Sequence, residues 1–195
     1  MHEIKHCAKK KPKGKLQSTK TKLIMWNQGK TLVIITGASR GLGQAISVQM
    51  AKHIANPTLV LISRAIDDLK ISEKLCKENN EKSQVILGQM DLNSAKLQDF
   101  NQFFDKSVDF KEFESLVLVH NAGSLGNQGT KIVDFDDGDQ IQAYWYLNVT
   151  SVMLLNSAVN KRHSNQFCSF STSQILNRNL LAYQFFWFTR KGGTF

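Results

Sequence analysis

The sequence predicts an α/β fold of the Rossmann-like type, in which helices cover both faces of a doubly wound parallel sheet. Three observations predict it. Short apolar segments alternate with longer helical segments, and a glycine-rich loop follows the first apolar segment. The chain has 195 residues of which 42% are hydrophobic, which is enough for one α/β domain with a buried core.

Four apolar runs have the length and composition of buried parallel strands. Such strands are apolar throughout because helices cover both of their faces. The four runs are Leu32–Thr36, Leu59–Ser63, Val85–Met90 and Leu116–His120. Each is followed by a segment long enough to cross back over the sheet, so the order of elements is the one that a parallel sheet requires.

Two of the crossover segments show a helical repeat of apolar residues. The first stripe consists of Leu97, Phe100, Phe103 and Phe104, and the second of Ile141, Tyr144, Trp145, Asn148 and Val152. Asn148 places an amide in the second stripe. That amide is either a functional group or a core or interface asparagine whose hydrogen bonds are satisfied by the backbone.

The glycine-rich loop joins the first predicted strand to a helical segment. Its glycines suit separate tasks: Gly37 allows a tight turn, Gly41 allows the backbone to approach a pyrophosphate, and Gly43 allows the helix to pack on the sheet. The sequence therefore predicts a dinucleotide-binding loop, although any tight strand-to-helix turn also tolerates glycine. Its predicted cofactor-binding residues are Gly37, Ala38, Ser39, Arg40, Gly41, Leu42 and Gly43.

The second predicted strand ends in Ser63 and Arg64, about twenty residues after the loop, where this kind of fold selects the adenosine ribose. A carboxylate there would accept a hydrogen bond from a ribose hydroxyl. Arg64 instead can pair with a 2′-phosphate, and Ser63 can donate to it. The position favours NADP(H) over NAD(H), with an ordinary solvated arginine at a strand end as the alternative.

Three further segments carry a resemblance to a known family. Asp91-Leu92 follows the third strand, Asn121-Ala122-Gly123 lies within the stretch 120–126, and the stretch 144–151 reads YWYLNVTS. With the glycine loop, these segments resemble the short-chain dehydrogenase/reductase superfamily and, within it, the sepiapterin reductases, over roughly residues 30–165. The resemblance implies that Asp91, Leu92, Asn121, Ala122 and Gly123 also contact the cofactor.

The resemblance also implies a chemistry, the transfer of a hydride from NADPH to a carbonyl. In the family a tyrosine donates the proton, a serine holds the carbonyl oxygen, an asparagine supports proton transfer, and a lysine four residues after the tyrosine lowers the tyrosine pKa. The matching candidates are Asn148, Ser171 and Tyr183, with Thr172 and Ser173 as alternatives for the serine.

The C-terminal stretch departs from this pattern. Trp187 stands four residues after Tyr183 where the family has lysine. Lys191 lies about 12 Å further along a helix, too far to act as a neighbour, and Arg190 does not reproduce a compact ammonium. Tyr183 is therefore either the catalytic tyrosine or a coincidental one. We expect Phe167–Ser173 to form a fifth strand, the sheet to be truncated after it, and residues 166–195 to be a divergent, incomplete end of the domain 29–195.

Two functions stay open. One is an NADPH-dependent carbonyl reductase of sepiapterin reductase type, acting on a pterin or another carbonyl compound in tetrahydrobiopterin biosynthesis. The other is a noncatalytic NADP-binding or truncated isoform that lacks the catalytic lysine. The resemblance further implies a cytoplasmic homodimer that pairs through helices including the one containing Asn148.

The net charge of +9 is concentrated at the N-terminus. Residues 1–22 contain eight lysines and one glutamate, which gives this segment +7, so a basic, nucleic-acid-binding domain is not indicated. We expect residues 1–28 to be a disordered extension; its run Lys9–Lys13 is either a solvated leader or a nuclear-import or polyanion-binding motif. The three cysteines lack metal-like spacing, and no apolar run is long enough to span a membrane.

Overall fold

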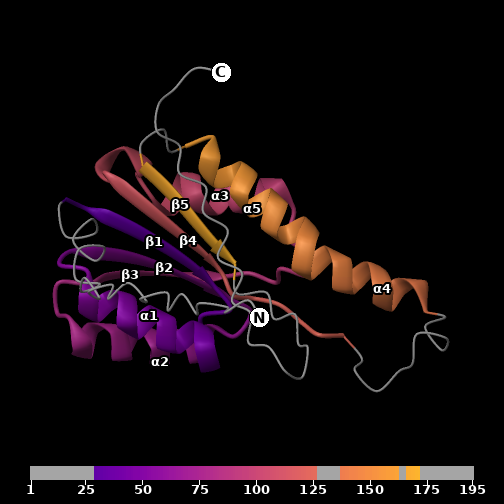
Figure 1. The fold of residues 1–195 in the computed structure, drawn as a ribbon, viewed down its shortest axis with the longest axis horizontal. Coiled ribbons are helices and arrows are strands. Elements are labelled where there is room, and N and C mark those ends of the chain that lie inside the picture. The colour runs from indigo at the N-terminus through magenta and orange to yellow at the C-terminus, as the bar shows by residue number, and fades with distance from the viewer. Residues whose placement is uncertain (1–28, 127–136, 163–165, 172–195) are drawn as a thin grey trace, which may run out of the picture.

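A computed structural model describes residues 29–126, 137–162 and 166–171 of the protein. These residues form an α/β fold around a five-stranded parallel sheet with the strand order β3-β2-β1-β4-β5 (Figure 1). The order of the strands reverses at β1, so the loops that follow β1 and β4 diverge to opposite faces of the sheet. The strands are β1 Thr31–Thr36, β2 Pro57–Ser63, β3 Gln84–Gln89, β4 Ser115–His120 and β5 Gln166–Ser171.

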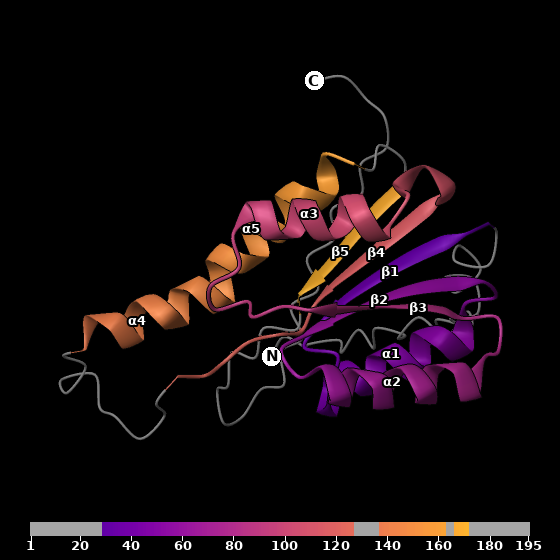
Figure 2. The same cartoon turned by 180° about the vertical axis from the view of Figure 1, so that it is seen from behind.

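Two layers of helices cover the sheet (Figures 1 and 2). Helices α1 (Gly41–His53) and α2 (Ile66–Asn79) lie together on one face, and α3 (Leu97–Ser107) and α5 (Ser151–Asn160) lie on the other. A short 3₁₀ turn, Phe110–Glu112, precedes β4. This three-layer arrangement is the Rossmann-like fold that the sequence predicts.

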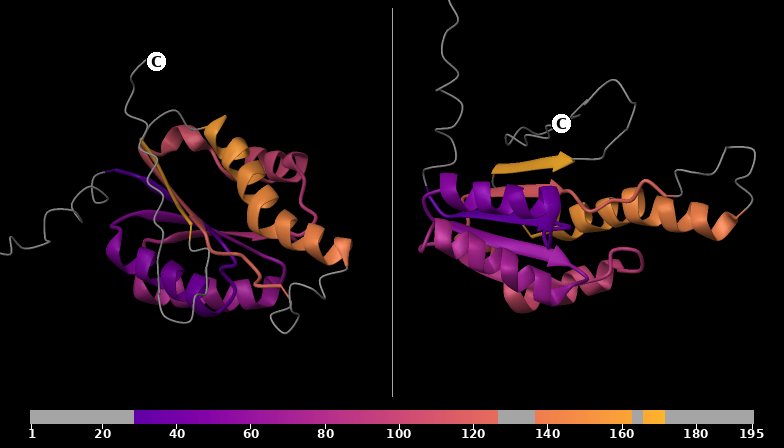
Figure 3. Two further views of the ribbon diagram at one scale, coloured as in Figure 1. Left: turned by 45° about the vertical axis from the view of Figure 1, so that its right-hand side comes forward. Right: turned by 90° about the horizontal axis from the view of Figure 1, so that it is seen from below.

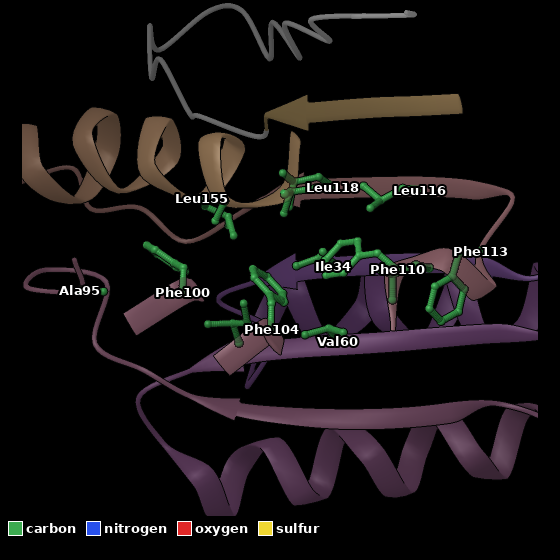
Figure 4. Packing of buried hydrophobic residues seen from close by; sticks show 14 of the residues in the cluster. Ile34, Val60, Ala95, Phe100, Phe104, Phe110, Phe113, Leu116, Leu118 and Leu155 are labelled. Carbon is green, nitrogen blue, oxygen red and sulfur yellow. The ribbon is translucent and has the colours of Figure 1, made fainter. Parts of the chain in front are cut away.

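The core between the sheet and α3 and α5 is rich in phenylalanine (Figure 4). Phe100 and Phe104 are fully buried one helical turn apart on α3, and they pack against Ile34 and Leu118 of the sheet. Burying an aromatic side chain of this size contributes about 2–3 kcal/mol. The first predicted stripe is thus the buried face of α3, with Leu97 and Phe103 at its margin.

A second core lies between the sheet and α1 and α2. It takes the alternate side chains of the strands, such as Leu59 and Leu61, together with Leu69 of α2. Cys76 of α2 is buried there as well, and burial, assisted by the nearby charge of Glu73, raises the pKa of its thiol to about 11. A thiol held protonated in this way is a packing group rather than a nucleophile.

The second predicted stripe is only partly right. Helix α4 (Gly138–Trp145) runs through a π-helical turn, Tyr146–Thr150, into α5, and it extends beyond the sheet (Figure 3). A π turn contains one extra residue, so it rotates the helix face that follows it. Because α4 extends beyond the sheet, Ile141, Tyr144 and Trp145 are exposed among the described residues, whereas Leu155 and Ala158 carry the burial of α5.

Several sequence predictions fall outside the described residues. They concern the extension 1–28, the alternatives Thr172 and Ser173, and the tyrosine candidate Tyr183 with its neighbours Trp187, Arg190 and Lys191. Within the ranges that the structure describes, no helix has the length and apolar character needed to cross a membrane.

Candidate cofactor-binding site

A cleft of about 340 Å³ lies at the carboxyl ends of the strands, beside the point where the strand order reverses. Ligands of open α/β sheets bind at this position. Of the predicted cofactor residues, those that line the cleft are Gly37, Ser39, Arg40, Gly41, Ser63, Arg64, Asp91, Leu92, Asn121, Ala122 and Gly123. Met90, Asn93 and Leu147 complete the lining; the sequence did not single out Met90 and Asn93, and it placed Leu147 in the stretch 144–151 without a cofactor role.

The turn after β1 depends on glycine at two points. Gly37 has φ +65° and Gly41 has φ +56°, both in the left-handed region that disfavours other residues. A Cβ atom on Gly37 would lie 2.9 Å from Asn121 Nδ2 and 3.0 Å from Ala122 Cα, whereas one on Gly41 would meet no atom within 4 Å. Gly37 therefore serves the fold of the turn, and Gly41 keeps the backbone bare on the open side of the cleft.

The remaining three predicted loop residues do not line the cleft. Ala38 is fully buried, and the side chain of Leu42 points to solvent with 41% of its surface exposed. Gly43 lies beneath the loop, where a Cβ atom would collide with the carbonyl oxygen of Gly37. Gly43 thus performs the close packing that the sequence predicts for it, without facing a ligand.

Helix α1 begins at the floor of the cleft and presents its positive end there. Its N-cap residue is Arg40, and no side chain of the described residues caps the first turn. The N–H groups at the start of a helix have no partners within the helix, and the helix dipole favours an anion at that end. The cleft therefore contains a phosphate-compatible helix terminus next to a glycine-lined turn.

A buried polar network supports the loop from behind. Ser72 of α2 donates to the carbonyl oxygen of Ala38 at 2.8 Å. Gln44 Nε2 lies 3.0 Å from Ser72 Oγ and 3.4 Å from the carbonyl oxygen of Ser39. These bonds fix the backbone of the loop to both α1 and α2, so the loop is held in place independently of a ligand.

Two cations face the cleft at the end of β2. Ser63 Oγ donates to Ser39 Oγ at 2.9 Å, which joins the end of β2 to the loop, and Arg64 and Arg40 flank this pair. Both arginines are exposed, and neither guanidinium forms an ion pair within the described part of the chain. Two uncommitted guanidinium groups and two hydroxyls therefore surround one corner of the cleft, a donor set suited to a phosphate.

Asn121 and Thr36 tie the ends of β4 and β1 together. Thr36 Oγ1 accepts from the backbone N–H groups of Asn121 and Ala122, both at 3.0 Å. Asn121 Nδ2 donates to the carbonyl oxygens of Thr36 and Gly37, both at 3.1 Å. The amide of Asn121 thus braces the turn below the cleft, and Ala122 and Gly123 form the adjoining wall.

The opposite wall is a turn that begins at Asp91. Asp91 Oδ1 accepts from the backbone N–H of Asn93 at 3.1 Å and from Asn93 Nδ2 at 2.7 Å. Leu92 is buried behind it in the phenylalanine-rich core. Both residues of the motif Asp91-Leu92 therefore line the cleft, and Leu92 also packs into the core.

Asn148 lies in the π turn, and its amide is engaged by backbone groups. Oδ1 accepts from the N–H of Ser124 at 3.1 Å, and Nδ2 donates to the carbonyl oxygens of Ser124 at 3.0 Å and Tyr144 at 2.9 Å. The backbone thus satisfies the amide in this structure, which is compatible with both roles that the sequence left open for Asn148. Asn148 nevertheless borders the cleft, because a Cβ atom on Gly123 would lie 2.9 Å from its Oδ1.

The other two catalytic candidates are placed less fully. Ser171 ends β5, and its Cα pairs in register with that of His120 at the end of β4. Its backbone is therefore at the same edge of the sheet as the cleft-lining Asn121. Tyr183 lies outside the described residues.

His120 is a buried titratable group next to the cleft. It is 4% exposed, and one of its ring nitrogens, Nε2, is 3.3 Å from Asn156 Oδ1 of α5. Burial lowers the pKa of the imidazole to about 4, although the bond to Asn156 opposes the shift. His120 is consequently neutral at physiological pH.

Four features together define a dinucleotide-binding α/β fold. They are the strand order, the glycine turn, the uncapped N-terminus of α1, and the cleft at the point where the strand order reverses. Comparison with protein families narrows this class. Residues 31–167 match the short chain dehydrogenase family, and the chain belongs to that family.

Known proteins resemble about 70% of the chain. The sepiapterin reductase of Rattus norvegicus is 29% identical over 140 residues, covering 70% of this chain and 53% of the relative. The benzil reductase of Bacillus subtilis is 29% identical over 139 residues, covering 69% of this chain and 49% of the relative. The chain thus spans about half the length of the curated relatives that it matches.

Solved structures agree on the fold. A bulky-bulky ketone specific alcohol dehydrogenase from Comamonas testosteroni has a TM-score of 0.54 at 25% identity, over 67% of this chain and 48% of its own. A short chain dehydrogenase from Escherichia coli, solved in complex with NADPH, has a TM-score of 0.59 at 21% identity, over 78% of this chain and 62% of its own.

Proposed function

We propose that the chain binds NADP(H) and belongs to a carbonyl reductase of sepiapterin reductase type, which reduces a pterin carbonyl in tetrahydrobiopterin biosynthesis. One observation carries the cofactor assignment. Arg40 and Arg64 face the same corner of the cleft without ion-pair partners among the described residues, beside the uncapped N-terminus of α1. The sepiapterin reductases among the relatives support the substrate class.

The residues present fit a dinucleotide that carries a 2′-phosphate. The N–H groups at the start of α1 and the bare backbone at Gly41 would hold the pyrophosphate. Arg64 and Arg40, with the hydroxyls of Ser39 and Ser63, would hold the 2′-phosphate. The turn at Asp91 and Leu92 would form the wall against the adenine.

Bound NADPH supplies a hydride, which in this family adds to the carbonyl carbon of the substrate. The carbonyl oxygen then takes up one proton, so that a ketone becomes a secondary alcohol. We assign the donation of that proton to Tyr183 and the positioning of the oxygen to Ser171. An unperturbed tyrosine titrates near pH 10, so proton transfer near neutral pH requires a nearby positive charge.

A second function rests on that requirement. Trp187 occupies the position four residues after Tyr183 where the family has lysine. Without the ammonium, Tyr183 is a poor acid catalyst at neutral pH, and the chain is then an NADP-binding isoform without reductase activity. The two functions differ in turnover and agree in cofactor binding.

The test combines binding and turnover on the 195-residue chain. We expect NADPH to bind, which a titration of its fluorescence measures. The oxidation of NADPH in the presence of sepiapterin, followed at 340 nm, then distinguishes the two functions. Turnover that Tyr183→Phe abolishes supports the reductase. Binding without turnover supports the noncatalytic isoform, and the absence of NADPH binding contradicts both.

A homodimer and a cytoplasmic location complete the proposal. Ile141, Tyr144 and Trp145 expose large apolar surfaces on α4, and exposed apolar patches often mark interfaces. Pairing of two copies through this helix would bury them. Members of the short chain dehydrogenase family usually form oligomers and bind small-molecule substrates.

A further inference from the structure

The π turn Tyr146–Thr150 contacts both walls of the candidate cleft. Asn148 binds the backbone of Ser124 on the wall that follows β4. Two residues earlier, Tyr146 donates its hydroxyl to the carbonyl oxygen of Ala95 at 3.0 Å. Leu147, between them, lines the cleft itself. π turns are frequent at functional sites, because the extra residue redirects side chains that an α-helix would aim elsewhere.

Ala95 closes the turn that forms the opposite wall. The N–H groups of Ser94 and Ala95 both bind the carbonyl oxygen of Asp91, at 3.2 and 2.9 Å. The carboxylate of Asp91 is bound by Asn93. These bonds shape the turn internally but do not attach it to the neighbouring helix.

The hydroxyl of Tyr146 provides that attachment. It reaches across 51 residues of sequence to a carbonyl on a residue that is only 4% exposed. A buried carbonyl oxygen that loses its donor costs free energy, so this bond favours one position of the turn. The wall that contains Asp91 and Leu92 is thereby fixed relative to the wall that contains Asn121 and Gly123.

We propose that Tyr146 is a positioning residue for the cofactor: by holding Ala95, it keeps the Asp91–Ala95 turn at the distance that the adenosine half of NADP(H) requires. The inference rests on the proposed function, since it names a residue that tunes the same cleft. Tyr146 does not line the cleft, so it acts through the turn and makes no contact with the ligand itself.

Tyr146→Phe removes the hydroxyl and keeps the ring. We expect this variant of the 195-residue chain to bind NADPH and 2′,5′-ADP about three- to tenfold more weakly, by calorimetric titration, because one hydrogen bond to the wall is lost. Hydrogen–deuterium exchange at the amides of Ser94 and Ala95 should rise in the same variant without ligand.

Two control variants separate positioning from general destabilisation. Tyr144→Phe removes the hydroxyl of the neighbouring tyrosine, which forms no hydrogen bond among the described residues. Asn80 follows the last residue of α2, at the end of that helix away from the cleft. Asn80→Ala removes its hydrogen bonds to the carbonyl oxygens of Ala51 and Ile54. Both variants should keep the affinities within about twofold of the parent, and for Asn80→Ala we expect this although hydrogen bonds are lost.

The outcomes are distinguishable. Unchanged affinities in Tyr146→Phe, or an equal loss in Asn80→Ala, overturn the positioning role and leave the proposed function intact. If the parent chain binds neither NADPH nor 2′,5′-ADP, the proposed function fails and the positioning role fails with it. In that case hydrogen–deuterium exchange at Ser94 and Ala95 reports only whether Tyr146 holds the Asp91–Ala95 turn in place.

Discussion

At the residue scale, Arg64 is the side chain on which the cofactor preference depends. Replacing it by alanine should weaken NADPH binding about tenfold or more, since a charge-assisted hydrogen bond to a phosphate contributes about 1.5–3 kcal/mol. NADH lacks the 2′-phosphate, so its affinity should hardly change. Fluorescence titration of both nucleotides against the parent and Arg64→Ala measures the ratio.

Lys52→Ala is the matched control for Arg64→Ala. It removes an exposed positive charge from the last turn of α1, at the far end of the helix from the cleft. Its effect on NADPH binding should stay within about twofold at an ionic strength of about 0.15 M, where distant surface charges are screened. Equal losses for NADPH and NADH in Arg64→Ala would contradict the assignment of Arg64 to the 2′-phosphate.

His120 is the residue that makes stability depend on pH. Burial lowers its pKa to about 4 in the folded protein, whereas an unfolded histidine titrates near 6.5. Between these values the unfolded chain binds the extra proton, so the stability that neutral His120 contributes is present above pH 6.5 and is lost as the pH falls toward 4. At pH 4.5 this loss amounts to about 2–3 kcal/mol.

Urea unfolding isolates the contribution of His120 to the pH dependence of stability. The parent and His120→Asn are each unfolded at pH 7 and at pH 4.5. Carboxylates titrate in the same range, but they are common to both proteins and cancel in the comparison. We expect the free energy of unfolding of the parent to fall further between the two pH values than that of the variant. Parallel losses in the two proteins would show that His120 titrates normally.

At the element scale, the parts of the fold that sequence could predict are those whose signal is local. Strands β1, β2 and β4 and helix α3 were predictable because burial demands an apolar run or a stripe such as Phe100 and Phe104. The glycine loop was predictable because two of its residues require positive φ. Each of these signals lies within a few consecutive residues.

The π turn was not predictable in the same way. The stripe from Ile141 to Val152 has a regular helical period in sequence, yet the helix is interrupted at Tyr146–Thr150. The cause is tertiary: Asn148 and Tyr146 form hydrogen bonds with Ser124 and Ala95, which are distant in the chain. Similarly, Met90 and Asn93 from the loop after β3 and Leu147 from the π turn line the cleft only because these distant segments meet there.

At the scale of the whole molecule, ligand binding and folding are linked, because the cleft is assembled from loops that follow β1, β2, β3 and β4 (Figure 1). These loops come together only in the folded chain, so a ligand of the cleft binds the native state and not the unfolded one. NADPH at 100 times its dissociation constant should therefore stabilise the chain by about 2.7 kcal/mol. For a domain of this size, that corresponds to a rise of about 5–10 °C in the unfolding midpoint.

The measurement is thermal unfolding, followed by circular dichroism, across a series of NADPH concentrations. The midpoint should rise with the logarithm of the concentration once the site is saturated, because the native state alone gains the binding free energy. 2′,5′-ADP should give the same dependence at higher concentrations, since it carries the phosphate and adenine that the described residues face. A midpoint that stays constant up to millimolar NADPH would mean that the four loops form a cleft that does not hold the dinucleotide.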